Sequence, residues 1–359
     1  MPTGREKPAD RDVRHDLERN DECLGEERLI GRRSLLGTAA IAALPFPRSQ
    51  AQPAPAGSGV RWPSENITIV TSLPAGSSVD LTTRVISEKL AHIWSKPVVV
   101  DNRGGANGVV ACEIVARARP DGHTLLATSA MTHAANPALY ERIPYDPIRD
   151  FAAVIPFMRA VPFVLMASKT LGVTTLTDLV TLLKEQPGRH NFGWGSVPAR
   201  LAFELFRIQA GVEAVHVGYR GNQAAFPDLI RGRIAMMAVD VIGAKPLIDR
   251  GEVDALALSD VARHPSLPTV PTSAEAGLPG FRFTTWNGLY APAATPPDVV
   301  EKVSRDIATV LDMPDVRARL DGMGALRAAP STPADFQAFT ASELELWGRI
   351  IRDAGVRLE

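Results

Sequence analysis

Short apolar runs alternate along the chain with longer segments in which apolar residues recur every three or four positions. The first pair is a β-branched run at 67–70 followed by a stripe of Leu81, Val85, Leu90 and Ile93. Short β-branched runs predict buried strands, and a spacing of three to four predicts helices. Because the two kinds of segment alternate, we expect an α/β protein built on a parallel sheet.

This alternation continues through most of the chain in two sets of similar size. Two such sets joined in the middle predict two α/β lobes with a central ligand cleft, the first made of 60–157 plus 287–359 and the second of 158–286. Further strands are predicted at 98–100, 124–128, 163–167, 191–193, 214–217, 234–239 and 255–259. Further helices are predicted at 109–119, 177–184, 199–210, 223–231 and 244–250.

Residues 1–51 lack this alternation. Their first 31 positions are polar and mix both signs of charge, which cannot build a core. Two arginines, Arg32 and Arg33, then precede a short apolar run at 35–44 and a small-residue ending at Ala51. This order predicts a signal peptide with a long charged n-region, cleaved after Ala51, and therefore a periplasmic product.

The paired arginines are compatible with export by the Tat route and equally with a Sec signal. The apolar run that follows them is too short for a bilayer span, which needs about 20 apolar residues. Residues 52–59 are rich in proline, alanine and glycine, and we expect a flexible tether there.

Composition narrows the partners and cofactors of the protein. The 359 residues are 45% hydrophobic and 22% charged, as in ordinary globular proteins, and their net charge of −1 provides no basic field for nucleic acid. Of the two cysteines, Cys23 and Cys112, cleavage would leave only Cys112. We therefore expect no disulfide, no cysteine zinc site, no metal, no cofactor and no nucleic-acid partner, and a monomer.

Three loops that follow predicted strands, at 73–80, 128–133 and 193–198, are rich in hydroxyl groups and glycine. Ligands of open parallel sheets bind beyond the carboxyl ends of the strands, where helices begin. There a carboxylate meets free backbone N–H groups and the positive end of the helix dipole. Serine and threonine before a helix can equally be simple caps. The candidate ligand-binding residues in these loops are Ala75, Gly76, Ser77, Ser78, Asp80, Ser129, Thr132, His133, Trp194, Gly195 and Ser196.

Asp240 and Arg200 complete the candidates, each with two interpretations. Asp240 follows a strand and would hold a ligand amine or hydroxyl, or cap the next helix. Arg200 would clamp a carboxylate with two parallel hydrogen bonds, or lie on the surface. Two other candidates also have a structural interpretation: Asp80 would be an acid of a first helical turn, and His133 would be a packed histidine. Trp286 is interpreted as a core or hinge aromatic residue.

Sequence signatures of enzymes are absent. The chain contains no G-x-S-x-G, H-E-x-x-H or Walker motif and no complete G-x-G-x-x-G. The glycine-rich segment 104–108 lacks dinucleotide-binding spacing, and Ser196 has no histidine base nearby in sequence. We therefore expect no catalytic residues and a protein that binds a ligand without transforming it.

Several short motifs, in their order along the chain, resemble the Bug family, the periplasmic receptors of tripartite tricarboxylate transporters. Each motif is weak alone, but together they extend over residues 60–359. They are Trp62-Pro63, PAGSSVD at 74–80, VVVDNRGG at 98–105, PDGHTLL at 120–126, NPALY at 136–140, PYDP at 144–147, HVGYRG at 216–221, PTVPTSAEAG at 268–277 and LYAPAATPP at 289–297.

This resemblance implies a type II periplasmic-binding-protein fold whose two lobes close on the ligand through a hinge. It implies that the three loops surround a bound carboxylate and that Asp240 lies on the cleft wall of the second lobe. The expected ligand is a small carboxylate, and the expected partners are the permease subunits of the transporter. A ligand sensor that signals to a membrane partner is an alternative function, and a periplasmic enzyme is a more remote one.

Two loops depart from the family pattern. The first has Leu73 and Ala75 in a loop where the family usually has a double proline and a double glycine, and the third is shortened and contains Trp194 followed by Arg200. A tryptophan would narrow the pocket and offer a stacking face. We therefore expect a ligand unlike citrate, aromatic or planar in shape. Closure is expected to bend the segments near 161–166 and 286–291.

Overall fold

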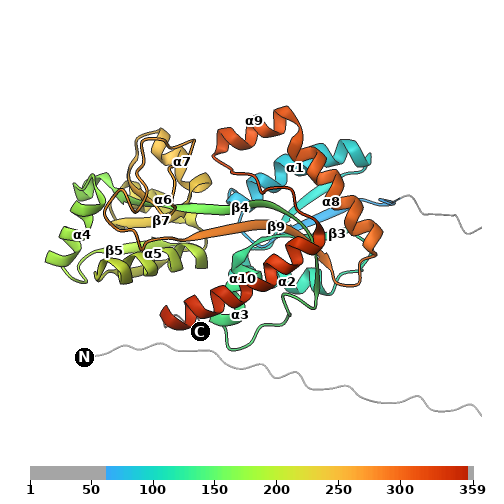
Figure 1. Ribbon diagram of the computed structural model, residues 1–359, viewed down its shortest axis with the longest axis horizontal. Helices are drawn as coiled ribbons and strands as arrows, with labels where there is room; N and C mark the ends of the chain where they lie inside the picture. Colours follow the sequence, from blue (N-terminus) through green and yellow to red (C-terminus); the bar gives the residue numbers. More distant parts are fainter. Residues whose placement is uncertain (1–61, 355–359) are drawn as a thin grey trace, which may run out of the picture. The chain divides into compact units, whose positions relative to one another are not determined.

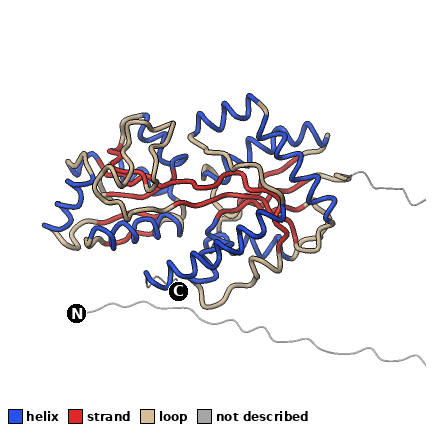
Figure 2. The backbone as a smooth tube through the Cα atoms, in the orientation of Figure 1, coloured by secondary structure: helices blue, strands red, loops and turns tan. Residues whose placement is uncertain are grey.

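The computed structural model describes residues 62–354, so the predicted signal peptide, the tether and Cys23 lie outside the described residues. The strands form one path in the order β2-β1-β3-β9-β4-β7-β5-β6, with β8 paired to β4 (Figures 1 and 2). Their bounds are β1 Ile67–Thr71, β2 Val98–Asn102, β3 Thr124–Ser129, β4 Phe151–Ser168, β5 Asn191–Trp194, β6 Val215–Gly218, β7 Met236–Asp240, β8 Val253–Leu258 and β9 Thr284–Pro292.

The first lobe is built on β2, β1 and β3, which run parallel, for example with Ile69 opposite both Val100 and Leu125. Helices pack on both faces of this sheet because both faces are apolar. In Figure 1, α1, α8 and α9 lie on one face and α2, α3 and α10 on the other. Their bounds are α1 Ser78–Trp94, α2 Val109–Ala116, α3 Asn136–Leu139, α8 Pro297–Asp312, α9 Pro314–Met323 and α10 Pro333–Ala354.

The second lobe repeats this arrangement on the parallel strands β7, β5 and β6. On one face α5 covers the sheet, with Phe203 stacked on Phe192 of β5 at 3.7 Å between ring centroids. On the other face α6 and α7 bury an aliphatic cluster that includes Leu229 and Leu247. The helix bounds are α4 Leu176–Glu185, α5 Val197–Ala210, α6 Asn222–Ile230 and α7 Val241–Asp249. Short helical turns lie at Gly105–Gly108, Met131–Ala135 and Lys169–Leu171.

Two long strands, β4 and β9, connect the lobes (Figure 2). Between Phe151 and Pro162, β4 pairs antiparallel with β9, and from Phe163 onward it pairs antiparallel with β7 and β8. The lobes therefore share a continuous hydrogen-bonded strand, and the sheet is mixed.

The prediction of α/β lobes is confirmed. The predicted parallel pairing is found in both lobes, whereas β4, β8 and β9 pair antiparallel. The predicted strand at 163–167 is only the second half of β4. Pro156, which has no backbone N–H, and the register shifts on either side of it break the alternation in the first half. No helix among residues 62–354 is both long and apolar enough to cross a membrane.

Candidate ligand-binding site

A cavity lies where the two lobes meet, at the carboxyl ends of the parallel strands. From the first lobe it is lined by the loop after β1 and the end of β3, with Leu73, Pro74, Ser77, Ser78 and Ser129. From the second lobe it is lined by Gly195, Ser196, Pro198, Gly221, Asn222, Gln223 and Asp240. The connecting strands β4 and β9 contribute Phe163, Thr285 and Asn287.

Four helices, α1, α5, α6 and α7, begin at this cavity. Three are capped by side chains: Ser77 accepts from the N–H of Asp80 at 3.3 Å, Ser196 from that of Ala199 at 3.4 Å, and Asp240 from that of Gly243 at 3.0 Å. Helix α6 has no side-chain cap. Because helix amino termini carry partial positive charge and free N–H groups, the cavity attracts anions.

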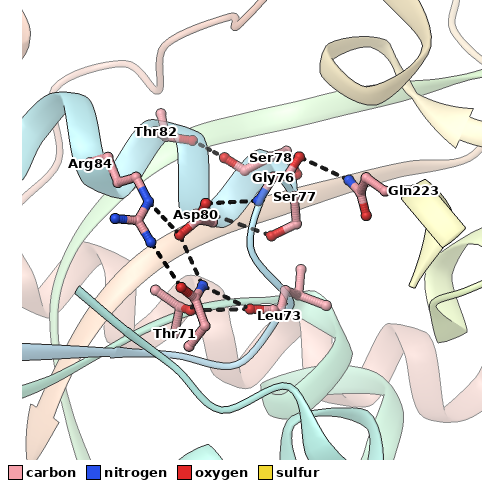
Figure 3. Close-up of polar contacts among 10 residues, drawn as sticks. Thr71, Leu73, Gly76, Ser77, Ser78, Asp80, Thr82, Arg84 and Gln223 are labelled. Atoms are coloured by element: carbon pink, nitrogen blue, oxygen red, sulfur yellow. Dashed lines mark hydrogen bonds and ion pairs between the residues drawn. The ribbon is translucent and has the colours of Figure 1, made fainter. Parts of the chain in front are cut away.

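Asp80 holds the first loop in shape rather than lining the cavity (Figure 3). Its buried carboxylate accepts from the N–H of Gly76 at 2.8 Å, from Arg84 Nε at 2.9 Å and from Asn102 Nδ2 at 2.9 Å. Burial alone would raise the pKa of Asp80, but these hydrogen bonds together lower it. The ionised carboxylate thus fixes the turn at Gly76, whose φ of +80° suits glycine.

Thr132 and His133 lie behind the cavity, and Ser129 lines it. The hydroxyls of Thr128 and Thr132 are 2.6 Å apart, and that of Thr132 is 2.9 Å from His133 Nδ1. The His133 ring stacks on Tyr290 at 4.0 Å, and burial lowers the pKa of His133 to about 3. His133 is therefore a neutral packed residue, the alternative considered for it from the sequence.

Trp194 faces away from the cavity because of the strand pairing at the end of β5. Trp194 lies opposite Gly218 of β6, and a Cβ placed on Gly218 would lie 3.2 Å from the indole ring. The guanidinium carbon of Arg200 lies 5.2 Å from the centre of the same ring. Neither Trp194 nor Arg200 lines the cavity, so the argument from Trp194 for an aromatic or planar ligand loses its structural basis.

Gly195 brings two loops of the second lobe into backbone contact. Its N–H donates to Asn222 Oδ1 at 2.9 Å, and a Cβ at this position would lie 2.0 Å from the carbonyl carbon of Gly221. No side chain fits there, so glycine is required for the loops after β5 and β6 to form one wall of the cavity.

Two hydrogen bonds join the lobes across the cavity. Gln223 Nε2 donates to the carbonyl oxygen of Gly76 at 2.8 Å (Figure 3), and Ser78 Oγ donates to Asp240 Oδ2 at 3.4 Å. Asp240 retains some exposure, and burial of its carboxyl raises its pKa. The walls are therefore in direct contact in this conformation.

The structure brings together at the cavity six of the thirteen candidates: Ser77, Ser78, Ser129, Gly195, Ser196 and Asp240. Ala75 lies in an adjoining groove. The other six candidates lie beside or behind the cavity and line neither the cavity nor the adjoining groove: Gly76, Asp80, Thr132, His133, Trp194 and Arg200. The sequence analysis missed Phe163, Asn222, Gln223, Thr285 and Asn287. Gly221-Asn222-Gln223 follows a strand and was a detectable signal, whereas Thr285 and Asn287 belong to β9, which the sequence analysis did not identify as a strand.

A cluster of Glu65, Asp121 and His123 has metal-ligand types at short range, but its groups are already paired. Arg119 forms ion pairs with Glu65 and with Asp121, the latter at 3.1 Å. The N–H of Ser64 donates to His123 Nε2 at 3.1 Å. We therefore interpret this cluster as a surface ion-pair network.

The sequence model of the tripartite tricarboxylate transporter family receptor matches residues 82–356. The UPF0065 protein of the tcbD-tcbE intergenic region in Pseudomonas sp. (strain P51) is 37% identical over 90% of this chain and 94% of that protein. Protein BugT of Bordetella pertussis is 31% identical over 83% of this chain and 92% of its own length.

Solved structures with the same fold include two with bound acids. The structure of R. palustris Rpa4515 with adipate has a TM-score of 0.79 and 32% identity, covering 82% of this chain and 99% of that one. MatC from Rhodopseudomonas palustris with bound malate has a TM-score of 0.75 and 31% identity, covering 81% and 100%. The periplasmic binding protein BugD has a TM-score of 0.78 and 26% identity, covering 83% and 100%.

Proposed function

The chain belongs to the receptor family of the tripartite tricarboxylate transporters, and we propose that it captures a small carboxylate-bearing metabolite in the cavity between its lobes. The ligand would then be delivered to the permease subunits of such a transporter. The adipate and malate bound by the two relatives of known structure support a carboxylate as the ligand class.

The observation that carries this proposal is the convergence of the amino termini of α1, α5, α6 and α7 on one cavity. Among the described residues that line it, none is a lysine, arginine, histidine or cysteine. An anion there would be held by backbone N–H groups and hydroxyl donors, each hydrogen bond to a charged group contributing about 1.5–3 kcal/mol. Such a lining suits capture and release, and it contains no histidine, lysine or cysteine to activate a nucleophile or to act as one, so we expect no turnover.

Within this cavity, the proposed ligand contacts are Ser77, Ser78, Ser129, Gly195, Ser196 and Asp240, to which Asn222 is added. Six further candidates would act by shaping the loops that carry these contacts, namely Gly76, Asp80, Thr132, His133, Trp194 and Arg200. Ala75 would act by lining the adjoining groove. The proposed lobe boundaries remain 60–157 plus 287–359 and 158–286. The change of β4 partners between Pro162 and Phe163 supports a hinge close to them.

We further propose that the protein acts as a monomer in the periplasm after cleavage behind Ala51. The periplasmic identity of the related BugD and the basic-apolar-small order of residues 32–51 support this. The intact mass of the protein recovered from a periplasmic extract tests it, since the expected first residue is Gln52.

The ligand class is tested by thermal unfolding with a panel of mono-, di- and tricarboxylates and, for each acid, its uncharged amide. We expect at least one acid to raise the melting temperature by several degrees while its amide does not, because only the charged form engages the helix termini. Native mass spectrometry of the purified protein would identify a retained acid. If no acid raises the melting temperature, or if amides act equally well, carboxylate capture is excluded.

A further inference from the structure

Asp240 is an acidic residue in a cavity that we propose for acids. Among the described residues that line this cavity it is the only carboxylate, and none of the others is a lysine, arginine or histidine. Asp240 caps α7, where its Oδ1 accepts from the N–H of Gly243 at 3.0 Å. Its Oδ2 faces the opposite lobe and accepts from Ser78 Oγ at 3.4 Å. A bound carboxylate would therefore meet a second carboxyl group with no cation between them.

A ligand held by the helix termini lies close to Asp240. Ser78 belongs to the first turn of α1, one of these termini, and its hydroxyl reaches Asp240 across the cavity. Ser196 and Asn222, at the starts of α5 and α6, line the same cavity. Two ionised carboxylates a few ångströms apart repel each other, and in such a pair one group takes up a proton, which the two then share.

Charged groups of the neighbouring elements do not relieve this repulsion. Strand β7 and the part of β4 that pairs with it contain no ionisable side chain except Asp240. In the loop after β8, Asp260 accepts from the N–H of Val261, and burial lowers the pKa of His264. On the surrounding helices and on β9 the ionisable residues have other partners: Asp80 with Arg84, Arg200 with the Trp194 ring, Asp228 with Arg233, Lys245 with Asp249, and Tyr290 with Thr340.

The surroundings of Asp240 already favour its protonated form. Burial raises the pKa of Asp240, and the hydrogen bonds from Gly243 and Ser78 offset this only in part. An anion bound beside the carboxyl group would raise its pKa further. A protonated carboxyl group can donate through its O–H, which turns a repulsive neighbour of the ligand into a hydrogen-bond donor.

We propose that Asp240 takes up one proton from solvent when the acid binds, and that its O–H group then donates a hydrogen bond to the carboxylate of the ligand. The proton joins Oδ2, the oxygen that faces Ser78, while Oδ1 continues to cap α7. Mild acidity therefore favours capture, and higher pH favours release. This inference rests on the proposed function and concerns the regulation of the same site.

Affinity should depend on pH in one direction. The pKa of Asp240 is higher in the complex than in the free protein, so the complex holds more protons, and affinity falls as pH rises through the interval between the two pKa values. Below that interval Asp240 is protonated in both states, and the dependence disappears. Carboxylic acids such as the ligand ionise near about pH 4–5, so measurements above about pH 6 exclude ionisation of the ligand itself.

The test counts protons by titration calorimetry of malate and of adipate in PIPES, HEPES and Tris near pH 7. The heat of binding varies with the ionisation heat of the buffer in proportion to the protons taken up. Affinities are then compared between about pH 6 and pH 8. If neither acid binds, the acid of the panel above that raises the melting temperature most takes their place.

The central variant is Asp240→Asn, because asparagine also caps helices and presents an N–H donor where the protonated acid presents its O–H. Its matched control is Asp249→Asn, which removes an exposed acid at the other end of α7. Asp240→Ser, a second neutral residue that caps helices, replaces Asp240→Asn if that variant does not fold.

We expect the wild type to take up about half a proton or more per ligand and to lose about tenfold or more in affinity between about pH 6 and pH 8. Asp240→Asn should take up no proton, bind with an affinity independent of pH, and bind more tightly than the wild type at the upper end of this range. Asp249→Asn should behave as the wild type does.

Two results would overturn the inference while leaving carboxylate capture intact. One is a wild-type protein that binds an acid with no proton uptake and with constant affinity, which would mean that Asp240 stays ionised beside the ligand. The other is a folded neutral variant at position 240 that retains the wild-type proton uptake, which would assign the proton to another group. Binding of no acid of the panel at any pH would instead reject the proposed function itself.

Discussion

A single buried carboxylate, that of Asp80, determines the shape of the first cavity loop. It collects hydrogen bonds from Gly76, Arg84 and Asn102, which belong to three different segments of the first lobe. The loop therefore presents Ser77 and Ser78 to the cavity because an acid behind them is ionised and fully engaged.

Asp80→Asn should lower the free energy of unfolding by about 1–3 kcal/mol at pH 7, because it removes a charge that several donors share. The pKa of Asp80 is lowered in the folded state, so its contribution is present above its unfolded pKa of about 3.9 and is lost as pH falls below that value. Urea unfolding should thus show that the free energy of unfolding of Asp80→Asn differs from that of the wild type by less at pH 3 than at pH 7.

The control for this prediction is Asp298→Asn, which changes an exposed acid in the first turn of α8. An exposed first-turn acid contributes only about 0.3–1 kcal/mol through the helix dipole. Equal losses for the two variants at pH 7 would mean that Asp80 is an ordinary first-turn acid.

Residue types alone predicted part of the site. Ser77, Ser196 and Asp240 stand immediately before helices, and hydroxyl and carboxylate side chains favour that position, so the sequence located these caps. The direction of Trp194 was not predictable in this way. The direction of the ring depends on which residue of β6 lies opposite Trp194. A shift of the β5–β6 pairing by one residue would turn the ring to the other face of the sheet.

At the scale of elements, the wall of the second lobe depends on backbone contact between the loops after β5 and β6. Gly195 allows this contact, because a Cβ there would overlap the carbonyl carbon of Gly221 at 2.0 Å. The same loops provide Ser196, Gly221 and Asn222 to the cavity, so their separation would displace several proposed ligand contacts at once.

Gly195→Ala should therefore weaken binding of the best carboxylate about tenfold or more and lower stability by about 1–3 kcal/mol, as expected for overpacking. Calorimetric titration and thermal unfolding measure the two effects. Gly322→Ala in α9, where a Cβ meets nothing within 4 Å, is the control and should be neutral or stabilising. Unchanged ligand affinity in a folded Gly195→Ala would show that the contact between the loops does not shape the site.

The elements that the sequence predicted well are those with a complete local pattern. The helix predicted at 177–184 is α4 at Leu176–Glu185, and the first β-branched run is β1. The first half of β4 and all of β9 lacked such a pattern. Most residues of both strands are buried whichever way they point, so most of their length does not alternate between apolar and polar. Thr285 and Asn287, which line the cavity, were missed because β9 was not identified as a strand.

At the scale of the whole molecule, closure of the lobes is coupled to the contacts that cross the cavity. Gln223 reaches from α6 to the carbonyl oxygen of Gly76 in the opposite lobe, and Ser78 reaches to Asp240. Such contacts exist only when the lobes are together, so they stabilise the closed state relative to any open one.

Gln223→Ala should shift the equilibrium toward the open state and raise the ligand dissociation rate about 2- to 10-fold, with a smaller effect on association. Stopped-flow kinetics measure both rates, and small-angle scattering should show less compaction at equal ligand concentration. Gln209→Ala, an exposed glutamine of α5, is the control. An unchanged dissociation rate in Gln223→Ala would mean that this contact does not contribute to closure.

The position of β9 also determines the order in which the chain can fold. The second lobe draws every strand of its sheet from a continuous stretch, β4 to β8, and can complete its strand pairing as soon as that stretch is synthesised. The first lobe cannot, because β3 and β4 are neighbours only through β9, which is the last strand within residues 62–354. Its early strands keep an unpaired edge, the kind of surface that chaperones protect, until that late segment arrives. The middle of the chain is therefore expected to fold before either end.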